Sequence, residues 1–426
     1  MTPEAGLPKG FAPASSDLHE TAAPEVAPAA NHLPLAGVRI VEFTHMVMGP
    51  TCGMVLADLG AEVIKVEPLA GDNTRRLLGS GSGFFPLFNR NKQSIAVDLQ
   101  TAEGREVVLK LIATADVVSE NFKPGTMAKL GLDYSTLSGL NSRLVYVSHK
   151  GFLPGPYDHR TALDEVVQMM GGLAYMTGRP GDPLRAGTSV NDIMGGMFGA
   201  IGVMAALAAR EKSGRGQEVQ AALFENNVLL VAQHMMQFAV TGQPAAPMPG
   251  RISAWGIYDV FTVKDNAQIF LAVVSDTQWT IFCQAFALDE LKADPRLATN
   301  NDRVLARPWL MPLLRTRLMP SSAAELAAVF EKSGLPFAPI TRPEDLLNDP
   351  HLIATGGLAP ITLPDGIKSG QTASTVLLPL TLDGKRPGVR TSPPRLGQHT
   401  REVLLGLGMT LEEVERLITQ GICAGE

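Results

Sequence analysis

An alternation of short apolar strands and helices constrains the fold of this chain more than any other feature. Residues 38–43 are typical of a strand, residues 50–59 of a short helix, and residues 62–67 of a second strand. This close succession forms a βαβ unit, which makes the two strands parallel with a right-handed crossover. Further strands are expected at 94–99, 116–120 and 144–148, with a helix at 103–115. We therefore expect an α/β fold with a parallel sheet of Rossmann type.

A chain of 426 residues is long enough to form two domains with separate cores. A stretch rich in proline, glycine and methionine at 242–250 marks a boundary, and the turn at 264–266 predicts a hairpin. We expect a disordered Ala/Pro-rich tail at 1–33, a Rossmann-like large domain at 34–240, a smaller α+β domain at 245–340, and a C-terminal segment at 341–426 that returns to the large domain.

The net charge and the cysteine content of the chain limit which partners, metal sites and cell compartment are expected. The formal net charge of -6 argues against binding to nucleic acid. Cys52, Cys283 and Cys423 are odd in number and far apart, which is typical of free thiols in a reducing cytoplasm and not of a disulfide framework or a metal site. No uninterrupted apolar run reaches the length of a membrane span, so no membrane association is expected.

Asp192 is the most informative single residue. It ends a β-branched stretch and is followed by glycines and by an apolar segment, 193–212, that predicts a buried helix. A carboxylate at such a junction is suited to nucleophilic attack. The same position also suits a helix N-cap, where aspartate accepts hydrogen bonds from first-turn amides. The local pattern leaves both interpretations open.

Basic residues cluster in two places, at Arg75, Arg76, Arg90 and Lys92 and again at Lys123 and Lys129, and the second cluster begins just after an expected strand. The carboxyl ends of parallel strands are where such sheets bind ligands, and cations there are suited to the phosphates of a nucleotide-containing cofactor. A solvated charged face is the alternative. The glycine-rich segment 79–83 lacks the lysine and the following helix of a phosphate-binding loop, which predicts a flexible loop.

Three further polar residues have ambiguous patterns. Asp164 and Glu165 are adjacent, so on a helix they point in different directions and are not a paired acid and base. They are also typical of negative charge at a helix N-terminus. Lys150 ends an expected strand and either faces a site or lies on the surface.

Taken together, several segments resemble the class III CoA-transferases, the family that includes carnitine, formyl-CoA:oxalate and succinyl-CoA:dicarboxylate CoA-transferases. The matching segments are residues 35–44, 59–67, 89–95, 120–125, 192–193, 214–219 and 396–400. The resemblance implies a Rossmann-like large domain, a small domain, and an interlocked homodimer of two ring-like chains. It further implies that Asp192 is the catalytic nucleophile.

The resemblance and the basic clusters define the expected sites. Coenzyme A, a substrate and not a permanent cofactor, is expected to contact Val97, Gln100, Asn121, Phe122, Lys129, Arg75 and Lys92. The substrate pocket is expected to contain His45, Val47, Met48, Lys150, Asp164, Gln168 and Arg251. We hypothesise that Lys150 or Arg251 binds a second carboxylate, as in a dicarboxylic acid.

The implied reaction transfers CoA from an acyl-CoA, such as succinyl-CoA, to a carboxylic acid through an aspartyl anhydride and an aspartyl-CoA thioester, without ATP or metal. One residue differs from the pattern of the family and affects the choice between a transferase and a racemase. Leu163 stands where transferases often have tyrosine and where the related α-methylacyl-CoA racemases have a histidine base. Leucine cannot transfer a proton, which makes a racemase the weaker alternative. The other alternative is a catalytically silent CoA-binding protein.

Overall fold

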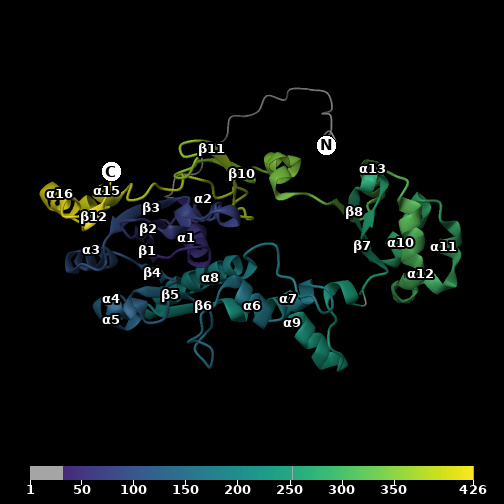
Figure 1. Cartoon of the computed structure of the whole chain (residues 1–426), viewed down its shortest axis with the longest axis horizontal. Coiled ribbons are helices and arrows are strands. Elements are labelled where there is room, and N and C mark those ends of the chain that lie inside the picture. Colours follow the sequence, from purple (N-terminus) through teal and green to yellow (C-terminus); the bar gives the residue numbers. More distant parts are fainter. Residues whose placement is uncertain (1–31, 252, 426) are drawn as a thin grey trace, which may run out of the picture.

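A computed structural model describes residues 32–251 and 253–425, so the predicted tail lies outside the described residues except for its last two positions (Figure 1). The large domain contains a seven-stranded sheet in the order β12-β3-β2-β1-β4-β5-β6. Its strands are β1 (Arg39–Phe43), β2 (Glu62–Glu67), β3 (Lys92–Val97), β4 (Val117–Glu120), β5 (Val145–Lys150), β6 (Glu218–Ala222) and β12 (Cys423–Ala424). All neighbouring strands are parallel except β12, which pairs antiparallel with β3. The parallel sheet is confirmed, in the Rossmann strand order.

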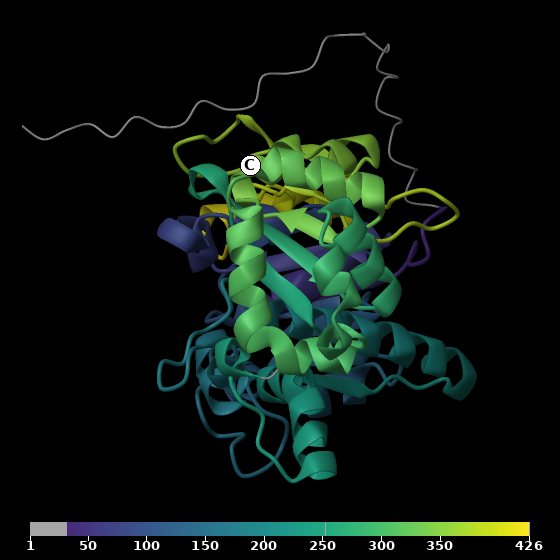
Figure 2. The same cartoon turned by 90° about the vertical axis from the view of Figure 1, so that its right-hand side faces the viewer.

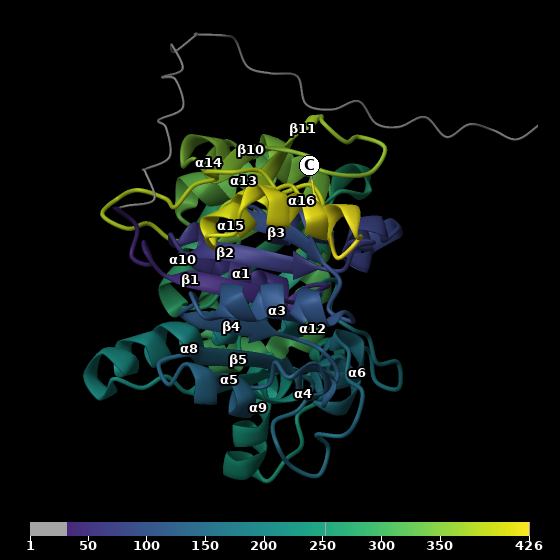
Figure 3. The same cartoon turned by 90° about the vertical axis from the view of Figure 1, so that its left-hand side faces the viewer.

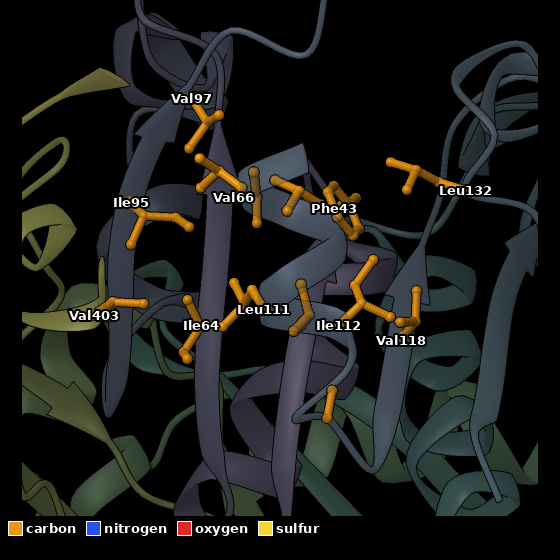
Figure 4. Packing of buried hydrophobic residues seen from close by; sticks show 14 of the residues in the cluster. Phe43, Ile64, Val66, Ile95, Val97, Leu111, Ile112, Val118, Leu132 and Val403 are labelled. Carbon is orange, nitrogen blue, oxygen red and sulfur yellow. The ribbon is translucent and has the colours of Figure 1, made fainter. Parts of the chain in front are cut away.

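Helices cover both faces of this sheet because consecutive strand residues point to opposite sides. Val41 and Ile64 face a core that also contains Val107 of α3 (Ala102–Ile112). The same core includes residues of α15 (Thr400–Gly406) and α16 (Leu411–Thr419), which lie over that face in Figure 3. Figure 4 shows Val403 of α15 among the side chains of this core. The neighbouring residues Ile40 and Val63 face a second core, formed with α1 (Met48–Asp58) and α8 (Val190–Ser213).

The remaining elements connect or extend this framework. The large domain also contains α2 (Phe84–Phe88), α4 (Thr126–Leu130), α5 (Tyr134–Leu140), α6 (Asp164–Met170), α7 (Leu173–Thr177) and α9 (Leu223–Thr241). After the small domain the chain forms α14 (Pro350–Ala354) and a hairpin of β10 (Leu358–Thr362) and β11 (Thr372–Val376). It then lies along the large domain, where the Arg390 guanidinium donates to the Ala57 carbonyl at 2.6 Å and β12 joins the sheet.

The small domain has a sheet and a core of its own. Its sheet consists of β7 (Ile257–Thr262), β8 (Gln268–Val273) and β9 (Phe337–Pro339), all antiparallel, and the hairpin predicted at 264–266 is confirmed. Four helices pack on it: α10 (Asp276–Ala285), α11 (Asp289–Ala293), α12 (Asn300–Leu318) and α13 (Ala323–Ser333). Phe261, Phe282 and Phe330 are fully buried between them. In Figure 2 this domain stands in front of the large sheet.

The long helix α8 is less buried than its sequence predicts. Met197, Phe198 and Ile201 are exposed, so the expectation of a helix buried on all sides is wrong for one face. By length and composition alone α8 is apolar enough to cross a membrane. In the structure its other face packs against α1 and the sheet through small residues, because Ala200, Val203 and Ala206 belong to the second core.

Glycines allow α1 and α8 to cross at close range. A Cβ atom on Gly196 would lie 2.4 Å from the Met48 carbonyl oxygen and 2.5 Å from Thr51 Cβ. We expect Gly196→Ala to lower the free energy of unfolding by about 1–3 kcal/mol, because the helices must separate to admit a methyl group. Urea denaturation measures this change. Gly139→Ala in α5 is a suitable control, since a Cβ atom at this helical glycine would meet nothing within 4 Å. Equal stability of the two variants would contradict the inferred close crossing.

Candidate active site

A large cavity lies at the carboxyl ends of the parallel strands, where a Rossmann-type sheet binds ligands. Its volume is about 1350 Å³. The first turn after β1 contributes His45, Val47 and Met48, the segment after β4 contributes Asn121 and Phe122, and the end of β5 contributes Lys150. Asp164 and Asp192 complete this set of sequence-predicted residues that line the cavity.

Asp192 lies in the first turn of α8, half-buried in the cavity wall. It is not the N-cap, because Ser189 occupies that position and forms no side-chain capping bond. Burial raises the pKa of Asp192 to about 7, with further contributions from the charges of Asp164 and Glu165. Within residues 32–251 and 253–425, no group donates a hydrogen bond to its carboxylate. A buried, unpaired carboxylate facing a cavity is suited to nucleophilic chemistry.

The Asp164 carboxylate binds backbone amides at the start of α8. One carboxylate oxygen accepts hydrogen bonds from the backbone amides of Asn191 and Asp192, at 2.7 and 3.1 Å. The other accepts from the Gln168 side-chain amide. Gln168 is buried behind the cavity wall, and its carbonyl oxygen accepts from the Ala186 backbone amide at 2.7 Å. Asp164 therefore borders the cavity while its carboxylate is bound to the start of α8.

The first turn after β1 is held on two sides. The Asn121 side chain accepts from the His45 amide at 3.0 Å and donates to the His45 carbonyl at 2.8 Å. Met46 has a positive φ of 64°, and its amide donates to Thr74 Oγ1 at 2.9 Å. A side-chain-bearing residue adopts this backbone conformation only where neighbouring contacts impose it. The turn that carries Val47 and Met48 into the cavity is therefore rigidly positioned.

The last two side chains of β5, His149 and Lys150, differ in charge: the imidazole is neutral, and the ammonium forms an ion pair with Glu120. His149 is buried with Nε2 3.2 Å from Ser119 Oγ, and burial lowers its pKa to about 3, so the imidazole is neutral at physiological pH. The Lys150 ammonium lies in the cavity wall but donates to Glu120 at 2.8 Å. The other Glu120 oxygen accepts from the Phe122 amide at 2.8 Å. The charge of Lys150 is thus already balanced within the protein.

Three of the predicted CoA contacts have buried side chains in this chain. Lys92 is fully buried and donates to both oxygens of Glu42, at 2.9 and 3.0 Å. The Arg75 guanidinium, only 3% exposed, binds Glu67 at 2.7 Å and Asp365 at 2.6 Å. Val97 is buried in the core of the sheet. These side chains face internal partners and not the cavity, since the strands that carry or adjoin them are covered on both faces.

Three other predicted residues lie apart from the cavity of this chain. Gln100 follows β3, Lys129 lies on α4, and Arg251 follows the small turn at Met248–Gly250, and all three side chains are exposed. None of them lines the cavity among the described residues. In the single chain these three residues are therefore not positioned to contact a ligand bound in the cavity.

One wall of the cavity consists of residues that the sequence pattern does not indicate. Residues of the segment 79–83 border it, and α2 follows immediately, although no helix was expected there. Phe84, Leu87 and Phe88 of this helix provide apolar lining. The signal available was the aromatic run at 84–88, which is too short for its periodicity to identify a helix.

Comparisons with known proteins agree with this geometry. A model of CoA-transferase family III matches residues 35–400. The chain is 34% identical over 400 residues to a succinate–glutarate CoA-transferase of Agrobacterium fabrum, covering 91% of this chain and 98% of the relative. It is 31% identical over 420 residues to a formyl-CoA:oxalate CoA-transferase of Bradyrhizobium diazoefficiens, covering 92% and 97%.

A solved structure extends the likeness to the fold. The crystal structure of a CAIB/BAIF family protein from Brucella suis matches with a TM-score of 0.77 at 34% identity, over 88% of this chain and 99% of that one. The family model thus covers both domains and the cavity that contains Asp192. The chain belongs to CoA-transferase family III and is a CoA-transferase.

Proposed function

We propose that this enzyme transfers CoA from succinyl-CoA or another short acyl-CoA to a carboxylic acid, with Asp192 as the nucleophile. The observation that carries the proposal is the Asp192 carboxylate, which lies in the wall of the main cavity and accepts no hydrogen bond from the described residues. A carboxylate without partners retains the lone pairs that attack on a thioester requires. The pantetheine arm of CoA would reach it past Asn121 and Phe122.

The reaction exchanges one thioester for another. An Asp192 oxygen attacks the acyl carbonyl, the C–S bond breaks, and CoA leaves as a thiolate from a mixed anhydride. The thiolate then attacks the Asp192 carbonyl and releases the donor acid as a carboxylate, which leaves an aspartyl-CoA thioester. The acceptor carboxylate attacks this thioester, and the released thiolate attacks the acceptor carbonyl, which regenerates Asp192. Each step consumes one negative charge and releases one, so charge is conserved throughout.

The relatives and the cavity support a dicarboxylic acid as one substrate. The Agrobacterium fabrum relative is named for succinate and glutarate. The Lys150 ammonium is 24% exposed in the cavity wall, and a second carboxylate would bind it by sharing or displacing Glu120. Leu163, which also lines the cavity, has no proton to transfer, so the residues do not favour a racemase.

We further propose that the enzyme is a cytoplasmic homodimer. Apolar side chains are exposed along two helices of the large domain, at Met197, Phe198 and Ile201 of α8 and at Leu229, Met236 and Phe238 of α9. Exposed apolar surface of this kind supports an interface. The three cysteines are free and buried, which supports a reducing compartment. Light scattering during gel filtration distinguishes a dimer from a monomer.

The test is to incubate the enzyme with succinyl-CoA and a panel of mono- and dicarboxylic acids and to identify new acyl-CoA species by mass spectrometry. We expect a new thioester with at least one acid, and hydroxylamine added during turnover should derivatise Asp192. Lys150→Met, compared with wild type, should raise the KM of a dicarboxylic acid while leaving that of a monocarboxylic acid unchanged. Turnover without a hydroxylamine-reactive Asp192 would disprove the covalent mechanism.

A further inference from the structure

The start of α8 is capped by another helix. The first backbone amides of a helix have no partner within it and are usually satisfied by the side chain of the N-cap residue. Ser189 makes no such bond. Instead Asp164, from the first turn of α6, accepts from the amides of Asn191 and Asp192 with one oxygen. This carboxylate is buried, so its bonds to the amides are shielded from water.

A second bond ties the segment that leads into α8 to the same helix. Gln168, one turn after Asp164, donates its amide to Asp164 and accepts the Ala186 amide with its carbonyl oxygen. Gln168 is fully buried, so its orientation is determined by these two bonds. Asp164 and Gln168 therefore hold α8 at its first turn and three residues before its N-cap. Asp192 belongs to this first turn and lines the cavity.

Building on the proposed function, we propose that Asp164 and Gln168 are positioning residues for the nucleophile. They hold the first turn of α8 so that the Asp192 carboxylate faces the cavity, and the Asp164 charge occupies the amides that would otherwise stabilise that carboxylate. Positively polarised amides at a helix N-terminus favour a bound negative charge. Because Asp164 already binds these amides, the Asp192 carboxylate lacks this stabilisation and is the more reactive nucleophile.

The charges around Asp192 agree with this assignment. After burial, Asp164 is the largest contributor to the raised pKa of Asp192. Glu165 contributes less, and its carboxylate is paired with Arg185. Across the cavity lie neutral His149, His45, whose pKa is lowered by burial, and Lys150, which is paired with Glu120. Of the two carboxylates that raise this pKa, only Glu165 is paired with a cation among the described residues.

The proposal is tested by a double variant that exchanges the acid and the amide between positions 164 and 168, compared with the single Asp164→Asn variant. In Asp164→Asn, the new amide nitrogen faces the Gln168 amide nitrogen, so two donors meet, and turning Gln168 over would only move the conflict to the Ala186 amide. In Asp164→Asn/Gln168→Glu, every bond has a donor and an acceptor again, and the negative charge moves away from the α8 amides. The measured quantity is the rate of CoA release from acyl-CoA in the first half-reaction, as a function of pH. Ser189→Ala, at the N-cap position that forms no capping bond, is the control.

We expect Asp164→Asn to lower kcat by about 10–100-fold through misplacement of the nucleophile. The double variant should recover most of this loss, since it restores the bonds. In wild type, the rate of CoA release should fall on the acid side near pH 7, as Asp192 becomes protonated. In both variants this acid limb of the pH–rate profile should move to lower pH by about one unit, because the negative charge of Asp164 is no longer bound to the first amides of α8. Ser189→Ala should change neither quantity.

Two results would overturn the proposal. One is an unmoved acid limb in both variants, which would reduce Asp164 to a structural residue. The other is a double variant that folds but is no faster than Asp164→Asn. If Asp164→Asn alone does not fold, the double variant is compared with wild type, and an unmoved acid limb in the double variant then overturns the proposal. Wild-type enzyme that transfers no CoA to any acid would instead contradict the proposed function itself.

Discussion

Asp192→Asn is expected to reduce CoA transfer by a factor on the order of 10³ or more, as the loss of a nucleophile does in covalent catalysis. The amide is nearly isosteric with the carboxylate, so the cavity should keep its shape. It lacks the negatively charged oxygen that forms the anhydride. The rate of acyl-CoA exchange and the loss of hydroxylamine trapping measure the effect. Transfer at the wild-type rate would show that another group attacks the thioester.

The same substitution should stabilise the fold at alkaline pH. Burial raises the pKa of Asp192 from 3.8 to about 7, so the folded state binds this proton more tightly than the unfolded chain. The stability that the protonated group contributes is present below about pH 4 and is lost as the pH rises through about 7. Asp192→Asn cannot ionise. Its Tm should therefore exceed that of wild type above pH 7 and converge with it in acid, and a lower Tm at all pH values would indicate general misfolding.

Lys92→Met is expected to destabilise the protein by about 3–5 kcal/mol, because it leaves Glu42 buried with reduced compensation. The Lys92 ammonium also donates to the Pro50 carbonyl at 3.0 Å and to Asn89 at 3.2 Å, so it connects β3 with α1. After its loss, the nearest cation to Glu42 is Lys65, at 3.9 Å. Methionine keeps most of the unbranched apolar part of the lysine side chain, so the effect of the lost ammonium group exceeds that of the small loss of volume.

A double-mutant cycle provides the control. Glu42→Gln/Lys92→Met should be more stable than the sum of the two single changes predicts, because the second substitution removes the charge that the first leaves unpaired. Guanidinium denaturation measures all four proteins. If Lys92→Met keeps wild-type stability but raises the KM of acyl-CoA, Lys92 binds a phosphate and the ion pair is not structural.

Local patterns were sufficient for much of the fold. Residues 62–67 were predicted as a strand, and β2 has these bounds because the apolar run is flanked by Gly60 and Pro68. The helix after β1 begins at Met48 and not at Pro50, since proline is tolerated in a first helical turn and is a poor marker of its start. The five-residue α2 was missed because it contains less than two helical turns and a proline.

Charged residues were predicted less well, because their partners are distant in the sequence. Lysine and arginine are rarely buried, so Lys92 and Arg75 were interpreted as ligand-binding cations. In the structure Lys92 pairs with a glutamate 50 residues away, and Arg75 with an aspartate 290 residues away. Only the folded chain brings such pairs together, and a buried pair has no charge left for a phosphate.

The sequence alone determined the type of fold and selected Asp192 as the candidate nucleophile. The βαβ succession follows from hydrophobic periodicity, which is local, and Asp192 was selected by its place among ordered family motifs. The tertiary structure decided which of three neighbouring carboxylates is available. Asp164 is bound to the α8 amides and Glu165 to Arg185, whereas the described residues leave Asp192 without a partner. Hydrogen bonding and burial set the reactivity of a carboxylate, and both depend on segments that meet only when the chain folds.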